Sequence, residues 1–250
     1  MAGRRTYFAA VVGGLVAAGA LGAVALGPDA GLIERIPPRW NPWAPLTLTA
    51  PPDRFLRFRL QRLSADPGRC RALLDEAAAL GDLDYTPVPD RVTGPGCGFT
   101  NAVQVAATSA SIGREPVALS CPAAASLALW ERHVLQPAAV ARFGSPVRRI
   151  EHYGTYACRG LYHRTAGPRS RHATADAVDV AGFVLEDGRR IRVARDWGGA
   201  PADLRSEEAA FLREVRDGAC RYFDAVLGPD YNAAHRDHFH FDRGPYRACR

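Results

Sequence analysis

Two segments rich in histidine and aspartate place the strongest constraint on the fold of this 250-residue chain. They cover residues 170–179 and 235–242, about sixty residues apart. In the second segment His238, His240 and Asp242 alternate with other residues, so on a strand they would share one face. Histidine and carboxylate together are donors that zinc prefers. The pattern therefore predicts a fold that brings both segments to one metal site.

The first segment would supply two of the metal ligands. His172 and Asp179 are seven residues apart, and the small residues between them allow both side chains to turn toward one ion. Asp179 lies between Val178 and Val180, and a charged side chain flanked by valines is seldom buried without a partner or a metal. With one histidine of the last strand, these residues would make three protein ligands. The fourth tetrahedral position would be left for water, as is typical of a catalytic zinc site.

Six cysteines are dispersed along the chain, and no two of them form a Cys-x-x-Cys pair. This spacing excludes a zinc ribbon and a thioredoxin-like motif. An even number of separated cysteines in an exported domain predicts up to three disulfides, whose pairing the sequence leaves open. The six are Cys70, Cys97, Cys121, Cys158, Cys220 and Cys249.

Export is indicated by the N-terminus, where Arg4 and Arg5 precede an uncharged stretch rich in alanine, valine, leucine and glycine. A secretory signal needs about 7–15 apolar residues and a membrane span about 20, and this stretch lies on the border. We therefore expect residues 1–27 to be a signal peptide that is cleaved or a transmembrane anchor that is retained. The protein would then be periplasmic or extracellular, and residues of about 6–27 would anchor it to the inner membrane if they are retained.

The chain contains no lysine, so its 32 basic residues are all arginine and give it a net charge of +6. The absence of lysine excludes a Schiff-base lysine and a P-loop lysine. A basic balance suits an acidic partner such as a cell-envelope polymer. No arginine-rich run interleaves with aromatic residues, and we therefore do not expect a nucleic-acid partner.

Apolar periodicity predicts one α+β domain over residues 53–250, after a proline-rich linker over residues 28–52. The predicted helices cover residues 53–63, 67–80, 121–135 and a stretch from 206 through 227. The predicted strands cover residues 103–112, 117–119, 147–156, 177–185, 190–193 and a last strand that carries the second histidine segment. Residues 87–99 are predicted to be rich in turns.

Three further motifs accompany the two segments: Cys158-Arg159, Gly-Ala-Cys-Arg at 218–221 and Leu-Gly-Pro-Asp-Tyr-Asn at 227–232. With them the chain resembles the bacterial extensin-like C-terminal domain family over nearly everything from Cys70 onward. That family is in turn similar to zinc D-alanyl-D-alanine carboxypeptidases and L-alanyl-D-glutamate endopeptidases, which share a Ser-x-His-x(6)-Asp motif and a late His-x-His. The resemblance implies a hedgehog- or DD-peptidase-like fold, with a small antiparallel sheet flanked by helices.

The resemblance also implies roles for the residues of the two segments. His172, Asp179 and His240 would bind Zn²⁺. In some of these peptidases the general base is a carboxylate three residues before the last ligand, which here is Asp237. In others the first histidine of His-x-His, here His238, lies beside the metal. Strand alternation favours the histidine, because the aspartate would point to the opposite face of a straight strand.

Arg159 matches an upstream arginine that those peptidases place near the substrate carbonyl or carboxylate. Ala175 departs from their pattern, because it stands where a glycine is expected, and an alanine is harmless there only if its φ is negative. His235 remains open between a supporting group and a surface residue. We expect structural roles for the other histidines, His133, His152 and His163.

These observations predict an exported zinc-dependent peptidase or amidase that acts on peptidoglycan peptides or a related cell-envelope amide. Its partners would be peptidoglycan or another envelope polymer, and the membrane through the N-terminal segment. The alternative is a non-catalytic wall-binding or structural domain on a peptidase-like fold, because a fold does not determine a function.

Overall fold

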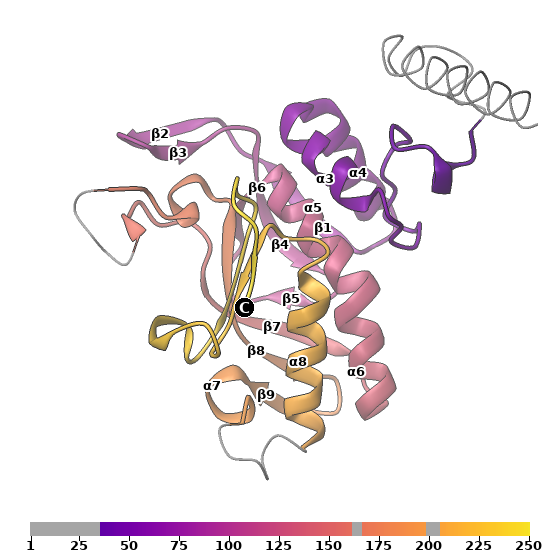
Figure 1. Cartoon of the computed structure of the whole chain (residues 1–250), viewed down its shortest axis with the longest axis vertical. Coiled ribbons are helices and arrows are strands. Elements are labelled where there is room, and N and C mark those ends of the chain that lie inside the picture. The colour runs from indigo at the N-terminus through magenta and orange to yellow at the C-terminus, as the bar shows by residue number, and fades with distance from the viewer. Residues whose placement is uncertain (1–35, 162–166, 199–205) are drawn as a thin grey trace, which may run out of the picture. The chain divides into compact units, whose positions relative to one another are not determined.

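The computed structural model describes residues 36–161, 167–198 and 206–250 (Figure 1). Among them, residues 36–45 and 53–55 belong to one compact unit, and the remaining residues form a second, larger unit that carries the candidate site. No helix within the described residues is both long and apolar enough to cross a bilayer. The predicted signal or anchor segment lies outside these residues, and the predicted domain boundaries stay predictions.

A ten-stranded sheet forms the centre of the larger unit. Its strands are β1 (Leu83–Pro87), β4 (Ala102–Thr108), β5 (Ser111–Ile112), β6 (Val117–Ser120), β7 (Val147–Gly154), β8 (Ala177–Leu185), β9 (Arg190–Arg192), β10 (Ala225–Leu227), β11 (Phe239–Asp242) and β12 (Ala248–Cys249). The main path is β1–β4–β5–β7–β8–β11–β10–β12, with β6 paired to β4 and β9 paired to β8. The pairing is antiparallel except for β5–β7 and β10–β12. The predicted α+β class is confirmed, but the sheet is larger than the small sheet that was predicted.

Helices pack along one side of this sheet (Figure 1). They are α3 (Leu56–Ala65), α4 (Pro67–Ala79), α5 (Cys121–Trp130), α6 (Gln136–Phe143) and α8 (Glu207–Ala219), with a single short turn, α7 (Val193–Asp196), after β9. Three of them begin at a side chain that caps a free backbone N–H: Asp66 for α4, Ser120 for α5 and Ser206 for α8. The predicted starts of these three helices are therefore confirmed to within one residue.

The apolar core lies between the sheet and these helices. Every residue of α5 is buried, and Trp130 at its end packs against Phe183 of β8 and Phe241 of β11 at ring distances of 6.3 and 5.3 Å. The indole N–H of Trp130 donates to the carbonyl of Val215 in α8, so its polar atom is satisfied. Phe241 thus marks the face of β11 that points toward the helices. Phe183 shares the core face of β8 with Val180, because the β7–β8 register shifts by one residue between Val180 and Gly182.

The opposite face of the same two strands carries the polar residues. Along β8, Asp179 stands between two buried valines that belong to the core. Along β11, His240 and Asp242 alternate with core phenylalanines. The antiparallel register places His240 directly opposite Asp179. Because strand side chains alternate between faces, core packing on one side forces these three side chains onto the other side.

Two local predictions were wrong. The helix predicted to continue through residue 227 ends at Ala219, because residues 225–227 are drawn into the sheet as β10 between β11 and β12. The region predicted as turns contains a two-stranded hairpin, β2 (Arg91–Gly94) and β3 (Cys97–Phe99), which extends from the body of the unit (Figure 1).

All six cysteines form disulfides, which confirms the prediction of up to three bridges. Cys70–Cys121 joins α4 to α5, Cys97–Cys158 joins the hairpin to the segment after β7, and Cys220–Cys249 joins the end of α8 to β12. They close loops of 29 to 61 residues. In the chain-entropy model, each closure contributes about 4 kcal/mol to the free energy of unfolding.

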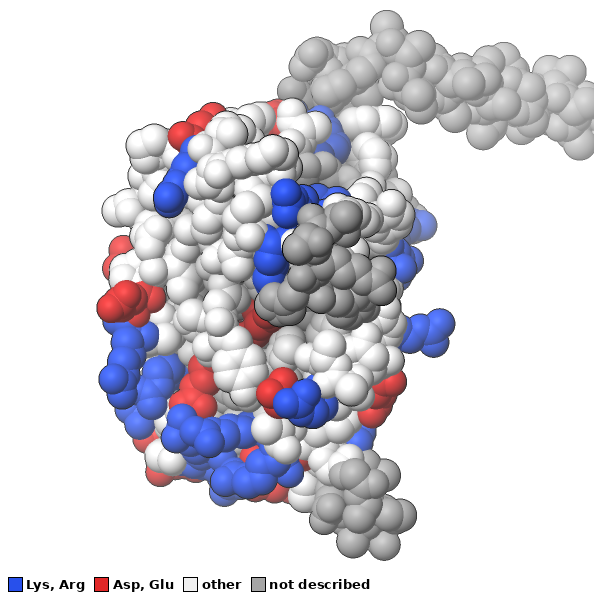
Figure 2. Space-filling model, turned by 90° about the vertical axis from the view of Figure 1, so that its left-hand side faces the viewer, with Lys and Arg blue, Asp and Glu red and all other residues white. Residues whose placement is uncertain are grey.

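Charged side chains are unevenly distributed on the surface. Figure 2 shows the side of the molecule on which the β2–β3 hairpin lies, and its upper part is mostly uncharged. Acidic and basic groups are mixed at the lower end, where β9 and α7 lie in Figure 1. Two ion pairs of these elements are Arg190 with Glu151 and Arg195 with Asp196.

Candidate metal centre

Three side chains that are distant in the sequence meet on the polar face of the sheet. Nε2 of His172 lies 3.2 Å from Nδ1 of His240 and 3.1 Å from a carboxylate oxygen of Asp179. Nδ1 of His240 lies 2.9 Å from the other oxygen of Asp179. The residues His172, His240 and Asp179 are 2 %, 9 % and 7 % exposed, respectively. The structure thus brings together the three residues that the sequence suggested as metal ligands.

His172 is held by a short 3₁₀ turn, η4 (Arg171–Thr174). The hydroxyl of Ser170 caps the turn by accepting a hydrogen bond from the backbone N–H of His172. On the ring, Nδ1 lies 2.9 Å from the carbonyl oxygen of Thr155, which can only accept a hydrogen bond. The proton is therefore on Nδ1, and Nε2 faces the cluster.

His240 is oriented by a carboxylate in the same way. Its Nε2 lies 3.0 Å from Oδ2 of Asp242, two residues further along β11. This hydrogen bond leaves Nδ1 directed at Asp179 and His172. A histidine whose far nitrogen donates to a carboxylate or carbonyl is the usual arrangement behind a metal-binding histidine, because it fixes the tautomer and raises the basicity of the ligand nitrogen.

The electrostatics of the cluster favour a cation at its centre. Burial by itself raises the pKa of Asp179, but hydrogen bonds with His172 and His240 hold that pKa well below its usual range. Burial lowers the pKa of His240, but its hydrogen bonds to Asp179 and Asp242 outweigh this and raise the pKa to about 9. The carboxylates therefore stabilise positive charge at Nδ1 of His240, whether a proton or a metal ion supplies it.

The donor set also fits zinc in kind and spacing. Two imidazole nitrogens and one carboxylate are ligands that zinc accepts, and a tetrahedral ion with bonds of about 2.0–2.1 Å holds its ligand atoms about 3.3 Å apart. The donor atoms of His172, Asp179 and His240 all lie within 4.8 Å of one another.

His238 and Asp237 lie side by side at the edge of the cluster. His238 precedes β11, and its Nε2 lies 3.6 Å from Asp179, while its Nδ1 lies 2.9 Å from the carboxylate of Asp237. The chain is turned here rather than extended, so Asp237 does not point away from the site as a straight strand would require. The two residues that sequence reasoning treated as alternatives are hydrogen-bonded to each other.

His235 belongs to the same site, although the sequence left its place open. Its ring lies 5.3 Å from that of His238 and 5.9 Å from that of His240, and its Nδ1 is 2.8 Å from the side-chain oxygen of Asn232. Burial, followed by the neighbouring histidines, lowers its pKa to about 4, so it is neutral at physiological pH. The Asn-x-x-His spacing is typical of a helical turn and is consistent with the bond between Asn232 and His235, but it does not predict that His235 lies beside the strand residues.

Arg159 also reaches the cluster. Its Nη2 lies 3.7 Å from Oδ2 of Asp179, and its side chain is partly exposed to solvent. The neighbouring Cys158 is tied to the β2–β3 hairpin by its disulfide with Cys97. The bridge therefore restrains the segment that carries the arginine.

Ala175 ends the turn that holds His172, and its φ is 56°. An alanine would be harmless at this position only with a negative φ, and the observed φ is positive. The backbone there is held on both sides, because the N–H of Ala175 donates to the carbonyl of His172 and its own carbonyl accepts from the N–H of Ser120. A left-handed alanine costs about 1 kcal/mol or more, so strain is stored one turn from a candidate ligand.

A cleft of about 860 Å³ is lined by Asp179, His240, His238, His235 and Arg159. Besides the cluster, its walls include Tyr153, Leu161, Arg169 and Tyr246. Two of the histidines expected to be structural do not line the cleft: His133 bonds to the carbonyl of Leu48, and His152 lies beside Gly113. The third, His163, lies outside the described residues.

The family of the chain is found by comparison with family models. The model described as extensin-like protein C-terminus matches residues 68–250, which include all the residues of the cluster. Neither the curated proteins nor the solved structures contain a match to the chain.

Proposed function

This chain belongs to the extensin-like protein C-terminus family, and we propose that it is an exported zinc-dependent hydrolase of amide bonds in cell-envelope peptides. We propose further that the fold is a variant of the hedgehog- and DD-peptidase-like fold. The antiparallel pairing of β8 with β11 supports this, because it sets Asp179 of the first motif opposite His240 of the second, while the turn η4 just before β8 carries His172.

The observation that carries the proposal is the convergence of His172, Asp179 and His240 with both histidines already oriented. Each imidazole uses its far nitrogen on a protein acceptor and turns the near nitrogen to the same point. Two histidines and one carboxylate would hold the ion, and three protein ligands are typical of a catalytic zinc site, whereas structural sites usually have four. Zinc bound there would act as a Lewis acid that polarises a carbonyl and acidifies water.

His238 and Asp237 are suited to carry the proton. Hydrolysis needs a base that takes a proton from the attacking water and an acid that gives it to the departing amine. Nε2 of His238 faces the cluster, and Nδ1 is oriented by Asp237. We assign proton transfer to His238 and its orientation to Asp237. His238 would pass the proton taken from water to the nitrogen of the departing amine as the amide C–N bond breaks. The hydroxyl of that water would bond to the carbonyl carbon and form the new carboxylate.

Arg159 is placed to hold the substrate. It lies at the wall of the cleft beside Asp179, with part of its side chain exposed. An arginine there can donate to the carbonyl or a nearby carboxylate of a bound peptide. The cleft volume of about 860 Å³ is within the range of small-molecule and peptide sites.

Export is supported by the three disulfides, because such bridges persist in oxidising compartments outside the cytosol. A periplasmic or extracellular location would place the cleft next to peptidoglycan. The N-terminal segment as signal or membrane anchor remains part of this proposal.

Metal analysis of the purified full chain tests the first step. We expect one zinc per chain, and loss of that zinc in His172→Ala. His133→Gln is the matched control, because it changes a histidine that bonds to Leu48 and does not line the cleft. Full zinc content in the His172 variant would refute the site.

Hydrolysis is tested on purified muropeptides by liquid chromatography and mass spectrometry. We expect a new amine and a new carboxylate, loss of activity with a chelator and recovery with zinc. His238→Gln should keep its zinc and lose most of the rate. Bound zinc without any cleavage would instead support the non-catalytic wall-binding alternative.

A further inference from the structure

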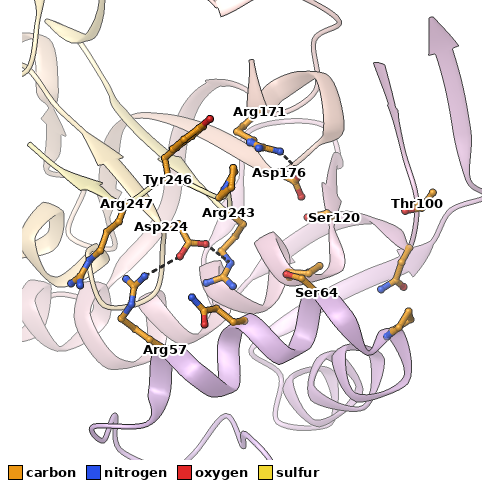
Figure 3. A pocket seen from close by; sticks show the side chains of 16 residues that line it. Arg57, Ser64, Thr100, Ser120, Arg171, Asp176, Asp224, Arg243, Tyr246 and Arg247 are labelled. Atoms are coloured by element: carbon orange, nitrogen blue, oxygen red, sulfur yellow. Dashed lines mark hydrogen bonds and ion pairs between the residues drawn. The ribbon is translucent and has the colours of Figure 1, made fainter. Parts of the chain in front are cut away.

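Figure 3 shows a second cavity, of about 600 Å³, and residues that line it also line the candidate cleft. The two share one rim, formed by Arg171, Gly244, Pro245 and Tyr246. Arg171 is adjacent in sequence to the candidate ligand His172, and Tyr246 is 80 % exposed. A chain bound in the cleft can therefore continue across this rim into the second cavity.

Gly244 has no side chain at the rim that the two cavities share. A Cβ atom at this position would lie 3.0 Å from Nε of Arg171 and 3.0 Å from Oδ1 of Asp242. The glycine therefore leaves room for both side chains, of which Arg171 lines both cavities and Asp242 bonds to His240. Gly244 thus lies where the two sites meet.

The cavity contains more positive than negative charge. Four arginines line it, Arg57, Arg171, Arg243 and Arg247, against two carboxylates, Asp176 and Asp224. The remaining lining is largely polar and uncharged, with side chains such as Ser64, Thr100 and Ser120 (Figure 3).

Both carboxylates are already occupied. Asp224 pairs with Arg57 at 3.2 Å and with Arg243 at 3.5 Å (Figure 3). Asp176 accepts a hydrogen bond from Thr174 at 2.6 Å. They are therefore poorly placed to neutralise further cations.

Two of the arginines keep capacity for an anion. Arg243 is used structurally, because it donates to the carbonyls of Leu60 and Tyr222. Arg171 has only a long pair to Asp176, at 4.0 Å, and its side chain is 35 % exposed. Among the described residues, Arg247 has neither an ion pair nor a hydrogen bond through its side chain, and it is exposed. The planar guanidinium group matches a carboxylate with two parallel hydrogen bonds.

One wall of the cavity comes from outside the family match. Arg57, Gln61 and Ser64 belong to α3, which ends before residue 68, where the match begins. The segment that precedes the family domain in this chain thus adds a cation to a cavity beside the candidate cleft.

We propose that this cavity is a carboxylate subsite, which binds an acidic residue of the same peptide whose amide lies at the His-Asp cluster. This inference rests on the proposed function for the orientation of the peptide. Arg247 and Arg171 would receive the carboxylate, Arg57 would add positive charge nearby while paired with Asp224, and the peptide backbone would cross the rim at Gly244 beside Tyr246. The substrate is accordingly an extended peptide that carries negative charge beyond the hydrolysed bond.

The test measures binding of two labelled peptides, (Ala-Glu)₄ and (Ala-Gln)₄, to the full chain by fluorescence anisotropy. We expect the glutamate peptide to bind at least about tenfold more tightly, which corresponds to one charge-assisted contact. Arg247→Glu should remove this preference, and Arg57→Gln should reduce it. Arg114→Glu is the matched control, because it is an exposed arginine that lines neither cavity, and it should bind as the wild type does.

The outcomes separate this inference from the proposed function. The preference for the glutamate peptide should persist in His240→Ala. The binding result can therefore be interpreted even if the protein binds no zinc or hydrolyses no substrate. If Arg57→Gln fails to fold, Arg247→Glu still decides, because it changes an exposed side chain. Equal binding of both peptides, or equal effects of Arg247→Glu and Arg114→Glu, would overturn the subsite. Displacement by inorganic tripolyphosphate at lower concentration than by the glutamate peptide would assign the cavity to phosphate instead.

Discussion

The two faces of strands β8 and β11 are both buried, but different forces hold them. The face toward the helices is apolar and ends in a cluster of Phe241, Phe183 and Trp130. The other face buries Asp179 and His240. Apolar burial stabilises the first face by about 25 cal/mol per Å². Buried charge destabilises the second face unless each group has a partner, so the site depends on its hydrogen bonds and on any cation they hold.

Two buried carboxylates illustrate the same difference. The oxygens of Asp179 lie among histidine nitrogens and Arg159, and its pKa is well below the usual range. Glu131, at the end of α5, accepts hydrogen bonds from neutral groups, including the hydroxyl of Ser109 and the backbone N–H of Ala110. Burial raises its pKa. Two buried carboxylates therefore differ: the charged neighbours of Asp179 favour its ionised form, and the neutral surroundings of Glu131 favour its protonated form.

The largest expected effect comes from the core face. Phe241→Ala should lower the free energy of unfolding by about 3–5 kcal/mol, because it removes a buried aromatic ring and leaves a cavity. Urea denaturation checks this value, with Phe241→Leu as a milder control. A loss below about 1 kcal/mol would mean that the helix-facing side is not the main source of stability.

Asp242 follows Phe241 in β11 but lies on the face that carries the candidate site, so its substitution should change zinc affinity. Asp242→Asn should weaken zinc binding about 10- to 100-fold, because it disturbs the hydrogen bond that orients His240. Competition with a chromophoric chelator measures the affinity. Asp237→Asn is the control and should leave zinc affinity unchanged, since Asp237 bonds to His238. Equal effects of the two variants would contradict the roles assigned here.

Glu131 makes the core side sensitive to pH. Its pKa is higher in the folded protein, so the folded state binds more protons than the unfolded state above pH of about 4.5. The contribution of Glu131 to stability should therefore be most favourable below that pH and decline as pH rises through the folded-state pKa. Glu131→Gln should remove this component, seen as a flatter plot of the free energy of unfolding against pH. An unchanged slope would show that the pKa of Glu131 is the same in the folded and unfolded states.

The smallest expected effect relieves strain beside the site. Ala175→Gly should raise the free energy of unfolding by about 0.5–1 kcal/mol, because glycine adopts a positive φ without steric cost. Ala173→Gly, in the same turn but without a positive φ, should lower it. Thermal denaturation of the pair measures the difference. Destabilisation by both changes would show that the methyl group of Ala175 contributes more by packing than it costs in strain.

Much of the candidate site was visible in the sequence. The spacing of His238, His240 and Asp242, and the placement of Asp179 among valines, indicated one polar strand face and a buried charge that needed partners. The relation of Asp237 to His238 was not visible, because it depends on a turn before β11 that strand alternation does not describe. His235 was left open for the same reason.

The sequence by itself determined the α+β class, the number of cysteines available for disulfides, most helix starts and the alternation of β8 and β11, because these depend on local periodicity and capping. Only the tertiary structure decided the size and order of the sheet, the pairing of the disulfides, the tautomer of His172 and the second cavity behind Gly244. These features depend on contacts between residues far apart in the chain, and no local pattern encodes which distant partner a strand, a thiol or a ring nitrogen will meet.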